Sequence, residues 1–267
     1  MNILIIGGGN MGATYAQSFL RSNVTASATL RILERSLERG AELRSRKVAE
    51  VGTDAAAMVP EADLIVLAVK PQDTAALFSA LRPLTHGQQV VLSIMAGVTM
   101  ASITAGLGLD KVVRAMPNLP AQVHEGMTAY TASAEVTRIE LATVQNLLAT
   151  TGKHIYVERE EMLDAATAIS GSGPAYVFYF MRAMMRRAEA LGFSASEAEL
   201  LVLQTFAGGV SLYQANDLDA DEWIARVSSR GGTTEAAVGH FEARDLDGVI
   251  GEGLQAAFER AVALGKA

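Results

Sequence analysis

The clearest chemical signal in the sequence is a glycine-rich turn near the start of the chain. It has the spacing G-x-G-x-x-G, follows the apolar stretch 2–6 and leads into a helical pattern. Such glycines permit a tight turn, close approach of the backbone to a diphosphate, and close helix–strand packing, with the diphosphate at the helix N-terminus. Because strand and helix patterns flank the turn, it predicts a dinucleotide-binding loop. The residues expected to contact the cofactor are Gly7, Gly9, Asn10, Met11 and Gly12.

The end of the second predicted strand bears on the choice of cofactor. An acid about 20 residues beyond the glycines binds the 2′-hydroxyl of NAD, whereas an arginine there receives the 2′-phosphate of NADP. This sequence offers both, because Glu34 is followed directly by Arg35 and Ser36. A guanidinium and a hydroxyl could hold a phosphate, while a carboxylate beside it would weaken binding. The pattern therefore favours the hypothesis that both NADPH and NADH are used.

Two further stretches follow the carboxyl ends of predicted strands, where open α/β sheets bind ligands. Small residues there let backbone groups approach a ribose or a nicotinamide, and a lysine could contact the cofactor. A proline that starts a helix and a glycine that makes a turn would explain the same residues without a ligand. The residues expected at the cofactor are Ala68, Val69, Lys70, Pro71, Ala96 and Gly97.

Later in the chain, two polar, glycine-containing clusters interrupt helical sequence. They are 170–174, SGSGP, and 228–234, SSRGGTT, and each precedes a helical pattern. A helix N-terminus presents unpaired N–H groups and the positive end of the helix dipole, so either cluster could hold a carboxylate. Both could equally be simple helix caps, and their spacing leaves the two interpretations open.

These candidate residues depend on two different kinds of structure. Up to about residue 157, short β-branched runs alternate with helical segments, which is typical of a parallel sheet covered on both faces. From Glu160 onward the pattern is helical only. We therefore predict a doubly wound, mostly parallel α/β Rossmann domain over 1–157 and an all-α domain over 158–267. The predicted strands are 2–6, 29–34, 64–69, 90–94, 112–115 and 127–130, with a weaker one at 48–51. The predicted helices are 11–21, 37–47, 74–81, 100–107, 136–150, 174–191, 195–214, 220–227, 233–241 and 246–264.

Composition narrows the classes of function. The 267 residues carry a net charge of -7, which argues against a basic groove for nucleic acid. The chain has no cysteine and four scattered histidines, so we expect no metal site and a reducing, cytoplasmic location. Apolar runs are too short to span a membrane. A mean hydropathy of +0.23 suggests surface buried against another subunit.

Taken together, the motifs resemble one family, the pyrroline-5-carboxylate reductases. The resemblance covers nearly the whole chain, with its parts in family order and at family-like separations. SGSGPAY and GGTT are far more specific than the dinucleotide motif. The motifs that carry it are GGGNMG at 7–12, AVKP at 68–71, AGV at 96–98, RAMPN at 114–118, SGSGPAYVF at 170–178 and SSRGGTT at 228–234.

The resemblance implies an activity and a set of roles. The family reduces the cyclic imine Δ1-pyrroline-5-carboxylate to L-proline with NADPH or NADH, and Glu160 matches a family position near the substrate. Thr234 is the candidate for orienting the imine or relaying a proton, although water or the substrate itself could also bring the proton. The residues implied to cradle the substrate carboxylate and ring nitrogen are Ser229, Gly231, Gly232, Thr233 and Thr234.

Assembly and cofactor choice also follow from the resemblance. Family members form dimers through intertwined helical domains, often assembled into larger rings, with an active site shared between chains. Two departures stand out. Leu119 replaces the usual threonine of an MPNTP segment, and Glu34 stands where many members carry a small polar residue. We expect NADPH to be slightly favoured.

Three alternatives fit parts of the pattern. A β-hydroxyacid dehydrogenase needs a catalytic lysine after the domain boundary, and the segment 173–185 has none. A reductase of another cyclic imine differs only in side chains that set ring size. A regulator that senses NAD(P) would keep the glycine turn but would not need the polar cluster 228–234.

Overall fold

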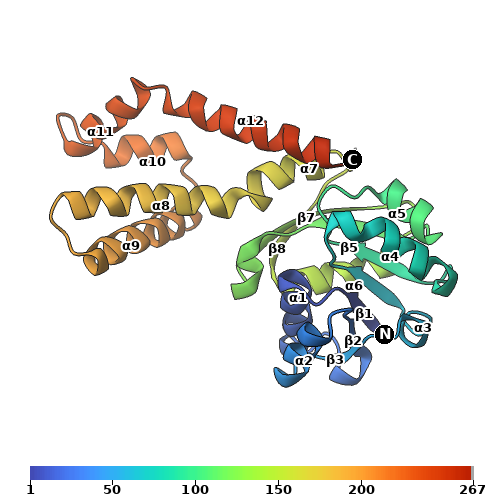
Figure 1. Ribbon diagram of the computed structural model, residues 1–267. Coiled ribbons are helices and arrows are strands. Elements are labelled where there is room, and N and C mark those ends of the chain that lie inside the picture. The colour runs from blue at the N-terminus through green and yellow to red at the C-terminus, as the bar shows by residue number, and fades with distance from the viewer. Residues whose placement is uncertain (266–267) are drawn as a thin grey trace. The chain divides into compact units, whose positions relative to one another are not determined.

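The computed structural model describes residues 1–265 (Figure 1). The chain forms two compact units. The first contains Met1–Pro174 and the end of the last helix from Ala257, and the second contains Ala175–Ala256. In the described part of the chain, no helix is long and apolar enough to cross a membrane.

One eight-stranded sheet organises the first unit. Its strand order is β3-β2-β1-β4-β5-β6-β7-β8, and every neighbouring pair is parallel except β6 and β7. The doubly wound order, in which β1 lies between β2 and β4, confirms the Rossmann prediction. The strands are β1 (Ile3–Ile6), β2 (Leu30–Leu33), β3 (Glu50–Gly52), β4 (Leu64–Leu67), β5 (Val90–Ser93), β6 (Val112–Met116), β7 (Gly126–Ala132) and β8 (Gly152–Tyr156).

The two faces of the sheet are covered by different helices, because successive side chains of a strand point to opposite faces. In β1, Ile3 and Ile5 pack with α1, α2 and α6, whereas Leu4 and Ile6 pack with α3, α4 and α5. All four residues are almost fully buried. The bounds of these helices are α1 (Asn10–Arg21), α2 (Leu37–Ser45), α3 (Ala55–Met58), α4 (Thr74–Leu81), α5 (Met100–Leu107) and α6 (Arg138–Ala149).

The second unit is entirely helical. Its long helices agree with the predicted ranges to within a residue, since their apolar residues recur with helical spacing. Gly192 has φ +107° just after α8 and ends that helix as a C-terminal cap. The helices are α8 (Gly173–Ala190), α9 (Ala195–Gln214), α10 (Ala220–Val227), α11 (Thr233–Glu242) and α12 (Leu246–Gly265), the last of which ends in the first unit.

The compact units divide later than the predicted boundary at 157. The alternating pattern does end there, just after β8, but the next segment stays with the sheet. It consists of α7 (Met162–Ala166) and a π-helical turn, Thr167–Gly171. Leu163 is fully buried and packs in a small core with Ala129 of β7, which explains why the first unit extends to Pro174.

Candidate functional site

The glycine turn lies between the central strand β1 and helix α1. Gly7 has φ +101°, and a Cβ there would lie 2.8 Å from the carbonyl oxygen of Ala68. A Cβ on Gly12 would lie 2.0 Å from the carbonyl oxygen of Gly7, so only glycine lets α1 approach β1 this closely. Gly9, the N-cap of α1, is different, because a Cβ there would meet no atom within 4 Å. Open space therefore lies beside Gly9 at the start of the helix.

This arrangement suits a dinucleotide. Gly9 receives no side-chain cap, and Asn10 and Met11 are the first residues of α1. Open backbone N–H groups at a helix N-terminus attract a diphosphate. The glycine turn therefore has the close helix packing, the open face and the donor groups that a dinucleotide diphosphate requires.

The three residues predicted at the adenosine end lie between β2 and α2. Both carboxylate oxygens of Glu34 accept backbone hydrogen bonds, Oε2 from Gly8 N at 2.8 Å and Oε1 from Ser36 N at 2.9 Å. The Ser36 hydroxyl caps α2 by accepting a bond from Arg39 N. Arg35 is largely exposed and pairs with Asp73 at 3.2 Å.

The other predicted cofactor residues follow β4 and β5, the next two strands along the same edge of the sheet. Backbone bonds from Ala68 N to Ile6 O and from Ile94 N to Leu67 O align these strand ends. Lys70 is exposed, and Pro71 begins a 3-10 turn. Parallel strands therefore bring Ala68, Val69, Lys70, Pro71, Ala96 and Gly97 to the edge that also carries the glycine turn.

The Gly97 turn has a structural partner as well. Gly97 has φ +74°, and a Cβ there would lie 3.2 Å from the Cβ of Leu264. The end of α12 thus lies against the loop between β5 and α5, and both belong to the first unit. The glycine is required for this approach as well as for the turn.

A buried ion network joins the end of β6 to the segment before α7. Arg114 is 4% exposed. Its Nη1 donates to Oε1 of Glu160 at 2.9 Å, and its Nη2 lies 3.5 Å from Oδ1 of Asp164. The same oxygen of Glu160 accepts the backbone N–H of Met100 at 2.7 Å, where α5 begins. Glu160 therefore fixes the end of the loop that contains Ala96 and Gly97.

Hydrogen bonds from the side chain of Asn118 hold the SGSGP segment in place. The side-chain amide of Asn118 donates to the carbonyl and hydroxyl oxygens of Ser170, while its oxygen accepts Met127 N at 2.8 Å. Gly171 ends the π-helical turn, and a Cβ on it would lie 2.8 Å from the Cε of Met116. Single π turns in helices are frequently found at functional sites. The predicted glycine cluster is thus partly helical itself, and it leads into α8.

Sequence reasoning assigned no role to Arg114 or Asn118. The available signal was a charged residue inside an otherwise apolar strand, VVRAM, because a buried arginine needs carboxylate partners. Those partners lie 46 and 50 residues away along the chain. Local sequence patterns cannot identify partners at such separations.

The polar cluster 228–234 forms the loop between α10 and α11 in the second unit. Gly231 has φ +72°, and Gly232 N donates to Ser229 O, so the loop turns tightly into α11. Gly232 is the N-cap, with no side-chain cap, and Thr233 and Thr234 begin the helix. Gly231 N donates to Oε2 of Glu235 at 2.6 Å. This backbone N–H thus already binds a carboxylate, the group that the loop is expected to recognise.

Comparison with known proteins agrees with this geometry. Residues 160–264 match the family model described as pyrroline-5-carboxylate reductase dimerisation, and residues 2–97 match the one described as NADP oxidoreductase, coenzyme F420-dependent. The chain is 36% identical over 263 residues to a pyrroline-5-carboxylate reductase of Pseudomonas aeruginosa, covering 98% of this chain and 96% of that protein. This chain belongs to the pyrroline-5-carboxylate reductase family.

Solved structures of the family share the whole fold. A pyrroline-5-carboxylate reductase from Coxiella burnetii has a TM-score of 0.90 at 32% identity, covering 100% of this chain and 99% of that chain. One from Plasmodium falciparum, solved with NADP bound, has a TM-score of 0.90 at 25% identity and covers 99% of this chain and 98% of that one. Membership in the pyrroline-5-carboxylate reductase family decides against the β-hydroxyacid dehydrogenase alternative.

Proposed function

We propose that this chain reduces the C=N bond of Δ1-pyrroline-5-carboxylate to give L-proline, with NADPH or NADH as the reductant. The observation that carries the proposal is the loop Ser229–Thr234 at the start of α11. It offers uncapped backbone N–H groups to an anion in a chain that also has a dinucleotide-binding turn. Full-length similarity to named reductases of this imine supports it.

The residues of this loop have distinct roles in the proposal. Thr233 holds the substrate carboxylate with its backbone N–H at the positive end of the α11 dipole. The N–H groups of Gly231 and Gly232, which here donate to Glu235 and to Ser229 O, join the anion site when the substrate displaces these partners. Ser229 and Thr234 supply hydroxyls, and Thr234 orients the ring nitrogen. When bound, the dihydronicotinamide supplies a hydride to the C=N carbon. A protonated imine accepts hydride readily, so the site needs accurate positioning and hydrogen bonds more than a nucleophile.

Gly7, Gly9, Asn10, Met11 and Gly12 hold the cofactor diphosphate, and the strand ends at 68–71 and 96–97 approach its nicotinamide half. Glu160 belongs to the same proposal as a positioning residue. Its Oε1 joins buried Arg114 to the N-terminus of α5 and so fixes the loop from Ala96 to Met100. Because this loop approaches the nicotinamide half of the cofactor in the proposal, Glu160 is expected to lie near the substrate.

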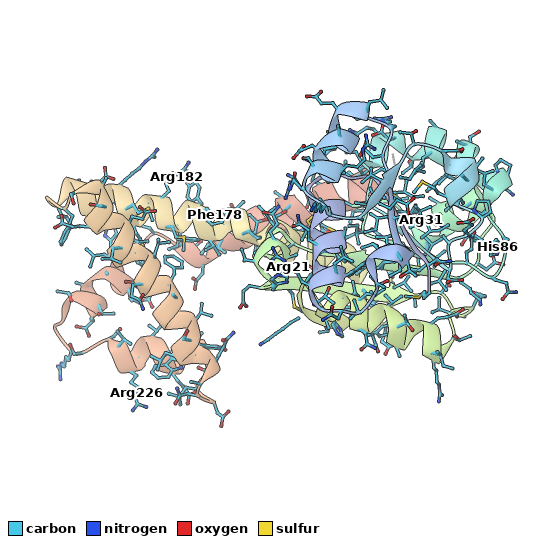
Figure 2. All side chains as sticks on the ribbon, turned by 90° about the horizontal axis from the view of Figure 1, so that it is seen from below. Arg21, Arg31, His86, Phe178, Arg182 and Arg226 are labelled. Atoms are coloured by element: carbon cyan, nitrogen blue, oxygen red, sulfur yellow. The ribbon has the colours of Figure 1, made fainter. Side chains whose placement is uncertain are left out.

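A homodimer is part of the proposal, because the helical unit cannot bury its own apolar faces. Of the described residues in this unit, only Ala198 and Val202 are buried. Side chains such as Phe178 and Tyr179 on α8 are about 60% exposed. Figure 2 labels Phe178 on this helix. A helix that is apolar around much of its surface is normally buried, and exposed patches of this kind mark interfaces.

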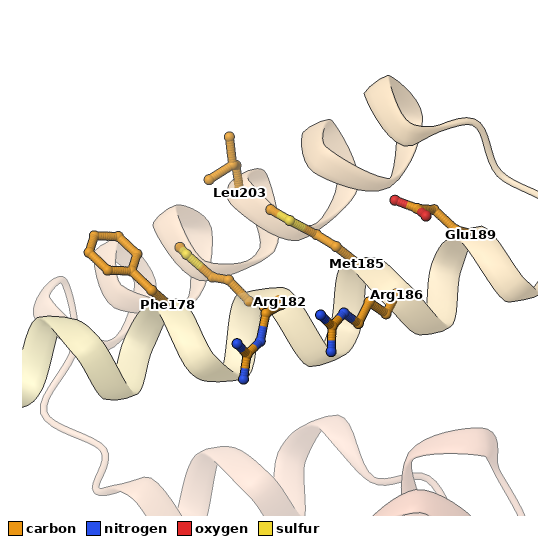
Figure 3. Close-up of a pocket in the computed structure, with 7 residues that line it drawn as sticks. Phe178, Arg182, Met185, Arg186, Glu189 and Leu203 are labelled. Atoms are coloured by element: carbon orange, nitrogen blue, oxygen red, sulfur yellow. The ribbon is translucent and has the colours of Figure 1, made fainter.

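The proposed interface covers the surface of α8 and α9. An open groove of about 480 Å³ runs between the two helices, lined by Phe178, Met185 and Leu203 among others (Figure 3). A second copy of the chain, with its helices intertwined, would bury this groove. Active sites shared between subunits, a larger ring of dimers and a cytoplasmic location complete the proposal. A chain without cysteine suits a reducing compartment.

The test is substitution of Thr234 by valine, which keeps the size and removes the hydroxyl. We expect kcat with pyrroline-5-carboxylate to fall by roughly 100-fold or more, since 100-fold is the lower end of the range for one positioned acid–base group. Cofactor affinity, measured by calorimetry, should not change. Thr143→Val on α6 is the matched control, since its hydroxyl donates to Ile139 O within its own helix. Equal losses of turnover and of cofactor binding would contradict the proposed role.

The same assay separates this reductase from a regulator that senses NAD(P). A regulator would bind the cofactor and turn over no cyclic imine. Rates with five-membered and six-membered imines would also distinguish pyrroline-5-carboxylate from a larger ring as the preferred substrate.

A further inference from the structure

The carboxylate of Glu34 is held rigidly at the edge of the glycine turn. One oxygen accepts Gly8 N at 2.8 Å and the other accepts Ser36 N at 2.9 Å. These two bonds join the glycine turn to the loop after β2, so the side chain has little freedom to move away. A carboxylate has about four acceptor positions, and acceptor capacity therefore remains on both oxygens.

This position is the one that reads the adenosine ribose in doubly wound folds. An acid at the end of the second strand accepts a hydrogen bond from the ribose 2′-hydroxyl. A 2′-phosphate in the same place offers only acceptors and negative charge, so it can neither donate to the carboxylate nor avoid repulsion from it. A fixed Glu34 thus favours a free hydroxyl.

The two arginines that could have received a 2′-phosphate have carboxylate partners of their own. The Arg35 guanidinium lies 3.2 Å from a carboxylate oxygen of Asp73, which brings a second negative charge to this region. The Ser36 hydroxyl accepts Arg39 N and so caps α2, which leaves only a neutral O–H donor that a 2′-phosphate could use. Arg39 donates its Nε–H to the carbonyl of Gly8 at 2.7 Å and pairs with Glu42. Arg35 and Arg39, the two arginines of this loop and helix, are therefore already paired with carboxylates.

We propose that Glu34 makes this chain select NADH over NADPH at the adenosine ribose. The inference rests on the proposed function, since it concerns the cofactor of that reaction. It reverses the expectation of a slight preference for NADPH.

Direct binding to the purified full-length protein tests the proposal without turnover. Dissociation constants for NADH and NADPH are measured by calorimetry. The isolated adenosine ends, 5′-AMP and adenosine 2′,5′-bisphosphate, are then compared as competitors. We expect NADH to bind roughly tenfold more tightly than NADPH or better, and 5′-AMP to compete better than the bisphosphate.

Variants locate the cause of the preference. Glu34→Gln keeps the size and removes the charge, so the NADPH-to-NADH ratio of dissociation constants should fall by roughly tenfold. The ratio is the readout because loss of one loop hydrogen bond would weaken both cofactors alike. Glu38→Gln, an exposed acid in the first turn of α2, makes the same charge change and should leave the ratio unaltered. Arg35→Ala should weaken NADPH no more than NADH.

Opposite results would overturn the inference. NADPH binding equal to or tighter than NADH in the unmodified protein would do so, as would an unchanged ratio in Glu34→Gln. Selective loss of NADPH in Arg35→Ala would show that the guanidinium receives the phosphate instead. If neither dinucleotide binds, the proposed function itself fails, and that outcome is distinct from a wrong preference.

Discussion

Substitution by alanine should have different effects at two glycines of the same turn: it should lower stability at Gly12 and weaken cofactor binding at Gly9. In Gly12→Ala, the added Cβ would lie 2.0 Å from the carbonyl oxygen of Gly7, well inside contact distance. The N-terminal turn of α1 must then move away from β1, and overpacking of this kind costs about 1–3 kcal/mol or more. We expect Gly12→Ala to lower the free energy of unfolding by at least about 2 kcal/mol.

Gly9→Ala should leave stability nearly unchanged. Its φ of -64° and ψ of -170° are allowed for alanine, and the added Cβ meets no atom within 4 Å. Alanine is a poorer N-cap than glycine by several tenths of a kcal/mol. The gain from a less flexible unfolded chain, about 0.4–1 kcal/mol, offsets that loss. The net change in the free energy of unfolding is therefore within about 0.5 kcal/mol.

Gly9→Ala, which should spare stability, should nevertheless weaken cofactor binding. In Gly9→Ala the methyl group occupies the open space where the diphosphate approaches the helix N-terminus, so NADH affinity should fall by roughly tenfold or more. Urea denaturation and calorimetry measure the two effects on the same samples. Unaltered NADH affinity in a stable Gly9→Ala protein would refute the placement of the diphosphate at this turn.

Three further predictions follow from other parts of the structure. Glu160→Ala leaves buried Arg114 with one carboxylate partner at 3.5 Å, and the free energy of unfolding measured with urea should fall by about 2 kcal/mol. The loss is smaller than for a fully buried ion pair because Glu160 is partly exposed. Glu160→Gln should recover part of it. Burial raises the pKa of Tyr15 from its ordinary value of 10.0 to about 12. The unfolded chain therefore loses this proton first, so stability should fall by about 2–3 kcal/mol as the pH rises from about 10 to above 12, but not in Tyr15→Phe. Phe178→Asp should shift the protein from dimer to monomer in sedimentation, whereas Ile139→Asp, at an 80% exposed site on the sheet unit, should not.

Sequence pattern predicted the strands best where both faces of a strand are buried. The segments β1 and β4 are continuous apolar runs, and this is what a central parallel strand requires. Strand β8 was missed because it reads Gly-Lys-His-Ile-Tyr and is mostly exposed at the edge of the sheet. The short helices α3 and α7 were also missed, since four or five residues are too few to show helical periodicity.

The candidate site was predictable to the extent that its chemistry is local. The glycine turn, Glu34 and the loop before α11 are each contained in a few consecutive residues, and their flanking elements have the predicted types. Partners distant in sequence could not be predicted. The pairing of Arg114 with Glu160, the contact of Gly97 with Leu264 and the bond from Gly8 to Glu34 all depend on tertiary structure.

The central claim is the reduction of pyrroline-5-carboxylate, and one measurement tests it most directly. Purified protein is mixed with NADH or NADPH and the imine, cofactor oxidation is followed by absorbance, and proline is quantified in the same samples. We predict saturable oxidation with one proline formed for each cofactor molecule oxidised, faster than with a six-membered imine and faster with NADH than with NADPH. Absence of proline with both cofactors would contradict the account.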